Sequence, residues 1–314
     1  MAKAVTIRIA IVSLIGNAAL AAAKFVVAAF SGSGAMFAEA VHSTVNAGNE
    51  ALLLLGIQRA ERPADALHPV GHGREFSFWS IVAAILLFGF GAGVSICKGF
   101  DKLGESRALE HVGWVYLVLG VAFLFQVGTW LATWRELGEP RAGRPLLTTL
   151  RQAKDSALFP LALAHGSALA GLALALAGVF CTDRLGWSWA DGTAALAIGA
   201  VMALAAIVLL LETRGLLIGD AAEPHLIEDI MGVAGRAAFV HGVNEVRVMQ
   251  FGPSDVLVNL SVDAHDHLAA RDVEAGVSAL EAEIRGRHPE ISQVFIEIQS
   301  GEGGPAGDGA PTLA

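Results

Sequence analysis

Long apolar stretches recur along the first 214 residues, and short polar connections separate them. A transmembrane helix needs about 20 predominantly apolar residues, and each of these stretches reaches that length. The pattern therefore predicts an α-helical membrane domain, over residues 1–218, with six spans. The predicted spans cover residues 4–30, 34–59, 77–100, 112–134, 156–181 and 189–214.

The periodicity changes after residue 218. Residues 224–239 and 270–288 have the spacing of helices, whereas residues 243–251, 255–264 and 292–299 have the alternation of strands. The order αββαβ predicts a small two-layer α+β domain over residues 219–300. Residues 301–314 are rich in Gly and Pro, which predicts a disordered tail.

Composition and charge agree with this division. The chain is 54% hydrophobic and 16% charged, whereas about 25% of residues are charged in a typical soluble protein. Residues 219–314 hold 16 acidic and 5 basic side chains, while the whole chain has a net charge of −9. An acidic domain of this kind disfavours nucleic acid as a partner and suits cations.

The basic residues of the connections predict the orientation. With a cytoplasmic N-terminus, ten Lys and Arg residues fall on the cytoplasmic side and four on the opposite side. This bias predicts a multi-pass protein with both termini in the cytoplasm. The lack of a transit-like leader favours the inner membrane of a bacterium.

The stretch AEAVHSTVNAGNE, residues 38–50, places several polar side chains on neighbouring faces of the second span. Counted from the predicted span starts, His42 and His165 lie about 12 and 14 Å deep. Ionisable groups at such depth are costly and usually face a bundle interior or a water-filled path. His42, Asn46 and His165 are therefore candidate ligands of a transition metal such as Zn²⁺. The alternative is that these side chains hydrogen-bond between packed helices.

The connection RPADALHPVGHGRE offers a second candidate metal site. Asp65, His68 and His72 supply one carboxylate and two imidazoles, which form a plausible partial ligand set for zinc. The alternative is a solvated polar loop.

The segments MFAEAVHS, DALHPVGHGRE, ADGTAALAIGAV and ETRGLLIGDAAEP resemble the cation diffusion facilitator family of divalent-metal transporters. The resemblance covers residues 5–299 and is greatest to the branch that contains zinc transporter 9. It implies a lipid-embedded homodimer that associates through its membrane domains and its metallochaperone-like cytoplasmic domains. It also implies export of a divalent metal in exchange for protons by alternating access.

The sequence departs from the family pattern inside the membrane. Asn46 stands where the family places a carboxylate, and His165–Gly166 replaces a Glu–Asp pair. The remaining ligands are neutral, so a bound dication would lack charge compensation. Glu39 is the first candidate to supply it and Asp191 the second. The alternatives are a packing hydrogen bond for Glu39 and an N-terminal helix cap for Asp191.

Two further charged residues accompany the stripe. Glu50 lies two turns beyond His42 and is expected to line a wet vestibule at the cytoplasmic exit. Lys24, on the first span, is expected either to reach the membrane surface or to pair with one of the acids.

The function favoured by these patterns is metal/proton antiport, with Zn²⁺ as the transported ion and as a candidate structural ion. Imidazole ligands suit zinc, cobalt or nickel better than manganese, and Co²⁺, Ni²⁺, Fe²⁺ and Mn²⁺ are alternatives. The second reading is a non-transporting or regulatory family member with a degenerate metal site. An intramembrane metalloenzyme is disfavoured because no nucleophile–base pair or paired catalytic carboxylates are predicted at membrane depth.

Overall fold

The computed structural model describes residues 2–69, 71–103, 109–136, 158–218, 224–252 and 255–300. The chain divides into two compact units. One comprises Met1–Arg62 and Glu75–Arg214, and the other comprises Pro63–Arg74 and Gly215–Ala314. The long helices therefore belong to the first unit, and the strands belong to the second.

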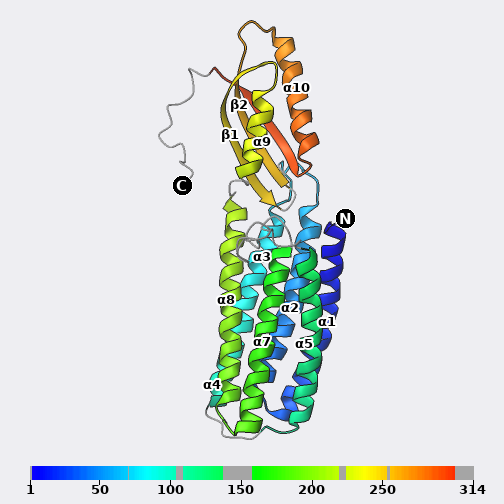
Figure 1. The fold of residues 1–314 in the computed structure, drawn as a ribbon, viewed down its shortest axis with the longest axis vertical. Helices are drawn as coiled ribbons and strands as arrows, with labels where there is room; N and C mark the ends of the chain where they lie inside the picture. The colour runs from blue at the N-terminus through cyan, green and yellow to red at the C-terminus, as the bar shows by residue number, and fades with distance from the viewer. Residues whose placement is uncertain are drawn as a thin grey trace. The chain divides into compact units, whose positions relative to one another are not determined.

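The first unit is a bundle of long, roughly parallel and antiparallel helices (Figure 1). One of its helical segments is continuous from Glu75 to Leu103 and contains a short π-helical stretch. The first residues of α1 and the last residues of α8 lie at the same end of the bundle (Figure 1). The helices are α1 (Ala2–Ser31), α2 (Gly34–Ala60), α3 (Glu75–Leu86), η1 (Leu87–Ala92), α4 (Gly93–Leu103), α5 (Val112–Glu136), α7 (Leu158–Leu185) and α8 (Ala190–Ile218).

Five described helical segments are long and apolar enough to cross a membrane. They are Val5–Ser31, Glu75–Leu103, Val112–Glu136, Leu158–Leu185 and Ala190–Arg214. Helix α2 also has sufficient length, since its 27 residues rise about 40 Å. Its polar stripe lowers its hydropathy, so the predicted count of six spans depends on this helix.

The bundle exposes large apolar side chains and buries several charged ones. Ile15, Leu124 and Ile85 are 65%, 74% and 61% exposed, whereas Lys24 and Glu39 are 2% and 1% exposed. This distribution suits a protein whose surface faces lipid, because ionisable groups in a membrane are buried within the bundle. The predicted class, an α-helical membrane protein, is confirmed.

Helix α2 lies in the interior of this unit, where it packs against α1, α3, α4 and α7. The turn before it requires glycine, because Gly32 has a φ of +70° that side chains with a Cβ rarely adopt. Gly32 donates its amide to the Ala28 carbonyl at 3.0 Å, which ends α1. The chain then reverses and places the polar stripe of α2 against α1 and α7.

The second unit contains the predicted αββαβ order. Its elements are α9 (Pro224–Gly235), β1 (Val240–Gly252), β2 (Asp255–Ala264), α10 (Ala270–Arg287) and β3 (Ile291–Ile298). The sheet order is β1-β2-β3, with β1 and β2 antiparallel and β2 and β3 parallel. The two helices and the sheet share one apolar core. The small α+β domain is therefore confirmed.

Two boundaries need comment. The helix predicted over residues 224–239 ends at Gly235, because Phe239 and Val240 are buried with the sheet, at 6% and 8% exposure. The predicted disordered tail and the predicted start of the fifth span at residue 156 lie outside the described residues.

Candidate functional site

The structure does not bring the three predicted intramembrane ligands together. His42 lies beside Ser167 of α7, at 3.4 Å between its Nε2 and the Ser167 Oγ, whereas His165 lies beside Glu50 of α2. Glu50 is eight residues beyond His42, which is about 12 Å along the helix. The structure shows two acid–imidazole pairs, and the shared site of His42, Asn46 and His165 stays a prediction. We call Glu39 and His42 the outer pair and Glu50 and His165 the inner pair.

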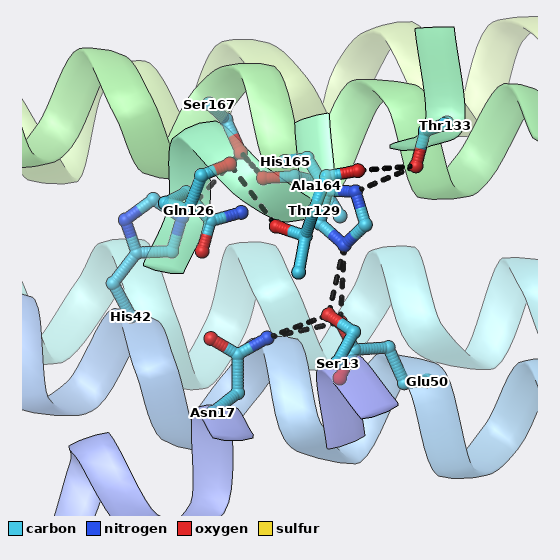
Figure 2. A network of polar contacts seen from close by, with 10 residues as sticks. All are labelled: Ser13, Asn17, His42, Glu50, Gln126, Thr129, Thr133, Ala164, His165 and Ser167. Atoms are coloured by element: carbon cyan, nitrogen blue, oxygen red, sulfur yellow. Dashed lines mark hydrogen bonds and ion pairs between the residues drawn. The ribbon is translucent and has the colours of Figure 1, made fainter. Parts of the chain in front are cut away.

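The inner pair is part of a fully buried polar network between α1, α2, α5 and α7 (Figure 2). The His165 Nε2 lies 2.8 Å from the Ser13 Oγ and 3.5 Å from the Glu50 Oε1. The Asn17 amide donates to the same Glu50 oxygen at 2.9 Å. Glu50 and His165 are both 0% exposed. No Lys or Arg contacts Glu50 within the described parts of the chain.

The hydrogens of this network are directed toward the carboxylate. Ser13 donates its hydroxyl hydrogen to Glu50, and Thr133 donates its own to the Thr129 carbonyl. The same two hydroxyl oxygens lie within hydrogen-bond distance of the His165 ring, 2.8 Å from Nε2 and 3.0 Å from Nδ1 (Figure 2). Which ring nitrogen donates depends on the tautomer. Hydroxyl groups of α1 and α5 therefore contact both ring nitrogens of His165.

The inner pair also has an unpaired oxygen that could bind a cation. The second carboxylate oxygen of Glu50, Oε2, has no hydrogen-bond partner among the described residues. One turn away on α2, Asn46 is 1% exposed, and its amide oxygen and nitrogen also lack described partners. Such groups are costly in a membrane interior unless a ligand satisfies them.

The outer pair differs from the inner pair by a lysine. The Lys24 Nζ of α1 lies 2.8 Å from the Glu39 Oε2 and 2.8 Å from the Ser43 Oγ. The other Glu39 oxygen, Oε1, lies 3.6 Å from the His42 Nδ1. Of the two positions considered for Lys24, the structure therefore shows the one paired with an acid. Glu39 was expected to compensate the charge of a bound metal, but in the structure its carboxylate pairs with the Lys24 ammonium.

Asp191 lies away from both pairs, at the start of α2. Its carboxylate accepts hydrogen bonds from the amides of Gly34 and Ala35 and from the Ser33 hydroxyl. Ser33 in turn accepts from the Met36 amide at 3.0 Å. The first amides of a helix have no partner within it, so these contacts cap α2. The alternative considered for Asp191, a helix cap, is what the structure shows, although the capped helix is not its own.

The connection between α2 and α3 forms a compact cluster. Asp65, His68 and His72 are the one group of three or more potential metal ligands found within 4.8 Å of one another in the described residues. The Asp65 carboxylate accepts the His68 amide at 2.7 Å and lies 3.2 Å from the His68 Nδ1 and 3.1 Å from the His72 Nε2. The His68 amide, followed by the His72 ring, holds the pKa of Asp65 well below its usual range. This carboxylate is therefore ionised throughout the physiological pH range.

Four polar residues of the bundle were not predicted as part of a site. They are Ser13, Asn17, Thr133 and Ser167, each of which contacts an acid or imidazole of the two pairs. Ser13 and Asn17 stand four residues apart in an apolar span, so they share a helix face in the same way as His42 and Asn46. That spacing is the signal that would have found them.

These features define a polytopic membrane protein with buried ionisable side chains inside its helix bundle. Residues 10–218, about two thirds of the chain, match the family model of the cation efflux transmembrane domain. The chain belongs to this family, the cation diffusion facilitators, whose members are transporters and not enzymes.

Several known relatives are similar along most of this sequence. Metal tolerance protein C4 of Arabidopsis thaliana is 26% identical over 79% of this chain and 55% of its own length. The human proton-coupled zinc antiporter SLC30A9, mitochondrial, is 23% identical over 88% of this chain and 55% of its own length. Manganese efflux system protein MneP of Bacillus subtilis is 24% identical over 93% and 95%. The chain thus spans about half the length of the first two relatives.

Proposed function

We propose that the protein exports Zn²⁺ from the cytoplasm in exchange for protons, by alternating access of the inner pair. The observation that carries this proposal is a buried carboxylate beside an imidazole, with no lysine or arginine among the described contacts of the carboxylate. Ionised groups at membrane depth need a compensating charge. A proton on His165 supplies it in one state, and a divalent metal supplies it in the other.

The geometry of the inner pair suits a zinc ion. Zinc binds His nitrogen and carboxylate oxygen at about 2.0–2.2 Å, so two ligands of a tetrahedral site lie about 3.4 Å apart. The His165 Nε2 and the Glu50 Oε1 are 3.5 Å apart. Asn46, one turn away on the same helix, offers an amide oxygen as a further ligand. The imidazole favours Zn²⁺, Co²⁺ or Ni²⁺ over Mn²⁺.

Proton exchange follows from the chemistry of this ligand set. Imidazole binds a metal through a lone pair, so a metal that arrives at His165 must displace the ring proton from that nitrogen. The name of the human relative, a proton-coupled zinc antiporter, agrees with this coupling. We place the protein in the membrane as a homodimer, as the family resemblance implies, with both termini cytoplasmic, as the basic connections imply.

We propose a second metal site at the Asp65–His68–His72 cluster, on the cytoplasmic connection between α2 and α3. The Asp65 carboxylate accepts hydrogen bonds from the Leu67 and His68 amides, and the turn they form brings the ligand atoms together. Little reorganisation is therefore needed for metal binding. A site exposed at the surface suits capture or structural binding of the ion.

The test is zinc flux into proteoliposomes that hold the purified protein and a zinc-sensitive dye, with and without a pH gradient. Saturable flux that follows the gradient is expected for the wild-type protein. Glu50→Gln and His165→Ala should each reduce it at least tenfold, because each removes a proposed ligand. His267→Ala, an exposed histidine of the second unit, is the matched control and should retain the wild-type rate. Saturable flux that ignores the gradient would contradict proton exchange.

The competing function is that of a non-transporting family member. It is favoured by the lack of any cluster of three acidic, His or Cys ligands within the described part of the bundle. A correctly folded protein that moves none of Zn²⁺, Co²⁺, Ni²⁺, Fe²⁺ or Mn²⁺ in the same assay would support this alternative.

A further inference from the structure

Lys24 is a buried ammonium near the C-terminal end of the apolar helix α1. It is 2% exposed, and its Nζ donates to the Glu39 Oε2 and to the Ser43 Oγ, each at 2.8 Å. Lysine is almost never fully buried unless it is paired, and near the end of a membrane helix its long side chain usually extends to the interface. Here it is directed inward, to the helix that carries both acid–imidazole pairs.

The outer pair has the ligand spacing of a metal site, but Lys24 neutralises its negative charge. The Glu39 Oε1 and the His42 Nδ1 are 3.6 Å apart, and neither has a hydrogen-bond partner among the described residues. The separation is close to the 3.5 Å of the inner pair and to the distance of about 3.4 Å between two zinc ligands. By distance alone, both pairs would accept the same ion.

The charges separate the two pairs. Glu50 brings one negative charge and no described lysine or arginine neighbour, whereas Glu39 brings one negative charge that Lys24 neutralises. A dication placed between Glu39 and His42 would lie close to an ammonium in a medium of low dielectric, where repulsion between like charges is large. The same ion at Glu50 meets no such repulsion.

We propose that Lys24 is a tethered counter-cation that occupies the outer pair in place of a metal ion and so confines the transported metal to the inner pair. The assignment of the inner pair rests on the proposed function, whereas the role of Lys24 at the outer pair stands on its own contacts. It follows that removal of the ammonium should reveal a latent third metal site between Glu39 and His42.

The test compares zinc binding and thermal stability of the full chain, purified in detergent, between wild type and Lys24→Met. Methionine keeps the length and apolar stem of lysine but lacks the charge. The variant is expected to bind one more Zn²⁺ than wild type in equilibrium dialysis. Its melting temperature should be low without zinc and should rise on adding zinc, because the ion binds the folded state.

Two double variants serve as controls. Lys24→Met/His42→Ala and Lys24→Met/Glu39→Gln each lack one proposed ligand, so neither should bind the additional ion. Lys24→Met/Glu39→Gln removes both charges and so leaves the outer pair neutral. Zinc should raise its melting temperature no more than it raises that of the wild-type protein. An unchanged zinc count in folded Lys24→Met would overturn the proposal.

His42→Ala in the otherwise wild-type chain keeps the proposal testable if Lys24→Met does not fold. Wild-type zinc binding should not change, because Lys24 already excludes metal from this pair. Loss of an ion in this variant would show metal at the outer pair beside Lys24 and would refute the proposal. The proposed function has its own test. If Glu50→Gln binds as many zinc ions as the wild-type protein, the inner pair is not a zinc site.

Discussion

Asp191 illustrates how single charged residues hold this bundle together. Its carboxylate accepts hydrogen bonds from two amides and one hydroxyl at the start of α2, although it belongs to α8. A carboxylate at a helix N-terminus is also stabilised by the positive end of the helix dipole. A neutral amide at this position would keep the shape and one acceptor oxygen, but it would lose the charge and the acceptor at the second oxygen.

We therefore expect Asp191→Asn to lower the free energy of unfolding by about 1–3 kcal/mol, the usual cost of leaving buried donors unsatisfied. Thermal unfolding of the purified protein in detergent measures this. Asp183→Asn is the matched control, because the Asp183 carboxylate pairs at the surface with an Arg184 that is 70% exposed. Such pairs contribute about 0–1 kcal/mol. Equal losses in the two variants would contradict the capping role.

The low pKa of Asp65 predicts how the loop cluster responds to acid. A carboxylate with a lowered pKa keeps its charge as the pH falls below its ordinary value of about 4, so Asp65 is still ionised at pH 5. Imidazole must be neutral to bind metal, and the free side chain titrates near pH 6.5. Zinc affinity of the loop should therefore be lower at pH 5.5 than at pH 7.5, because protons compete with the metal for the imidazole nitrogens while Asp65 keeps its charge.

Isothermal titration at pH 7.5 and 5.5 checks this expectation in a Glu50→Gln background, which isolates the loop. Asp65→Asn should weaken binding at both pH values, whereas Asp101→Asn, an exposed acid of α4, should leave it unchanged. Zinc affinity that stays constant between the two pH values would show that the histidines do not bind the ion.

At the scale of the element, α4 and α8 approach each other through glycines. A Cβ on Gly99 would lie 2.8 Å from the Leu196 amide nitrogen, and one on Gly192 would lie 3.1 Å from the Gly99 carbonyl oxygen. Small residues at such positions let membrane helices pack backbone to backbone. The contact therefore depends on the lack of side chains on both helices.

Gly99→Ala should push the two helices apart and destabilise the protein by about 1–3 kcal/mol, as overpacking does. Gly48→Ala on α2 is the control, because a Cβ there would meet nothing within 4 Å. Alanine is the better helix former, by about 0.5–1 kcal/mol, so this control should be neutral or stabilising. Chemical or thermal unfolding in the same detergent compares them.

The elements could be predicted from the sequence, but their relative positions could not. Apolar length and alternation give the helices and strands to within a few residues, because both depend on local spacing. The depth of His165 depends instead on how far α7 is displaced along α2. An error of a few residues in a span start moves a side chain by several ångströms. That displacement is what places His165 beside Glu50 rather than His42.

At the scale of the whole molecule, the two proposed metal sites belong to different compact units. Binding energies at distant sites that share no contacts are additive to a good approximation. We expect two zinc ions per wild-type chain, one ion each after Asp65→Ala or Glu50→Gln, and none in the double variant. Equilibrium dialysis measures these counts, and loss of both ions in a single variant would contradict independent sites.

The site as a whole was only partly accessible to sequence reasoning. Glu39 and His42 stand three residues apart, so their proximity follows from helix geometry alone. The partners Lys24 and Ser13 come from another helix, and their contacts are set by packing between α1 and α2. Long-range pairing of this kind leaves no periodic trace in a single sequence, which is why Glu50 was assigned to a vestibule and not to a pair.

The cap on α2 has a mechanical consequence. Asp191 fixes one end of this helix to α8, so a tilt of α2 would pivot near Ser33. Glu39 lies six residues from that point and Glu50 seventeen, or about 9 and 26 Å. Such a tilt would displace Glu50 roughly three times as far as Glu39. In the proposed transport cycle, a small tilt of α2 would therefore move the inner pair while the outer pair stays close to the fixed end.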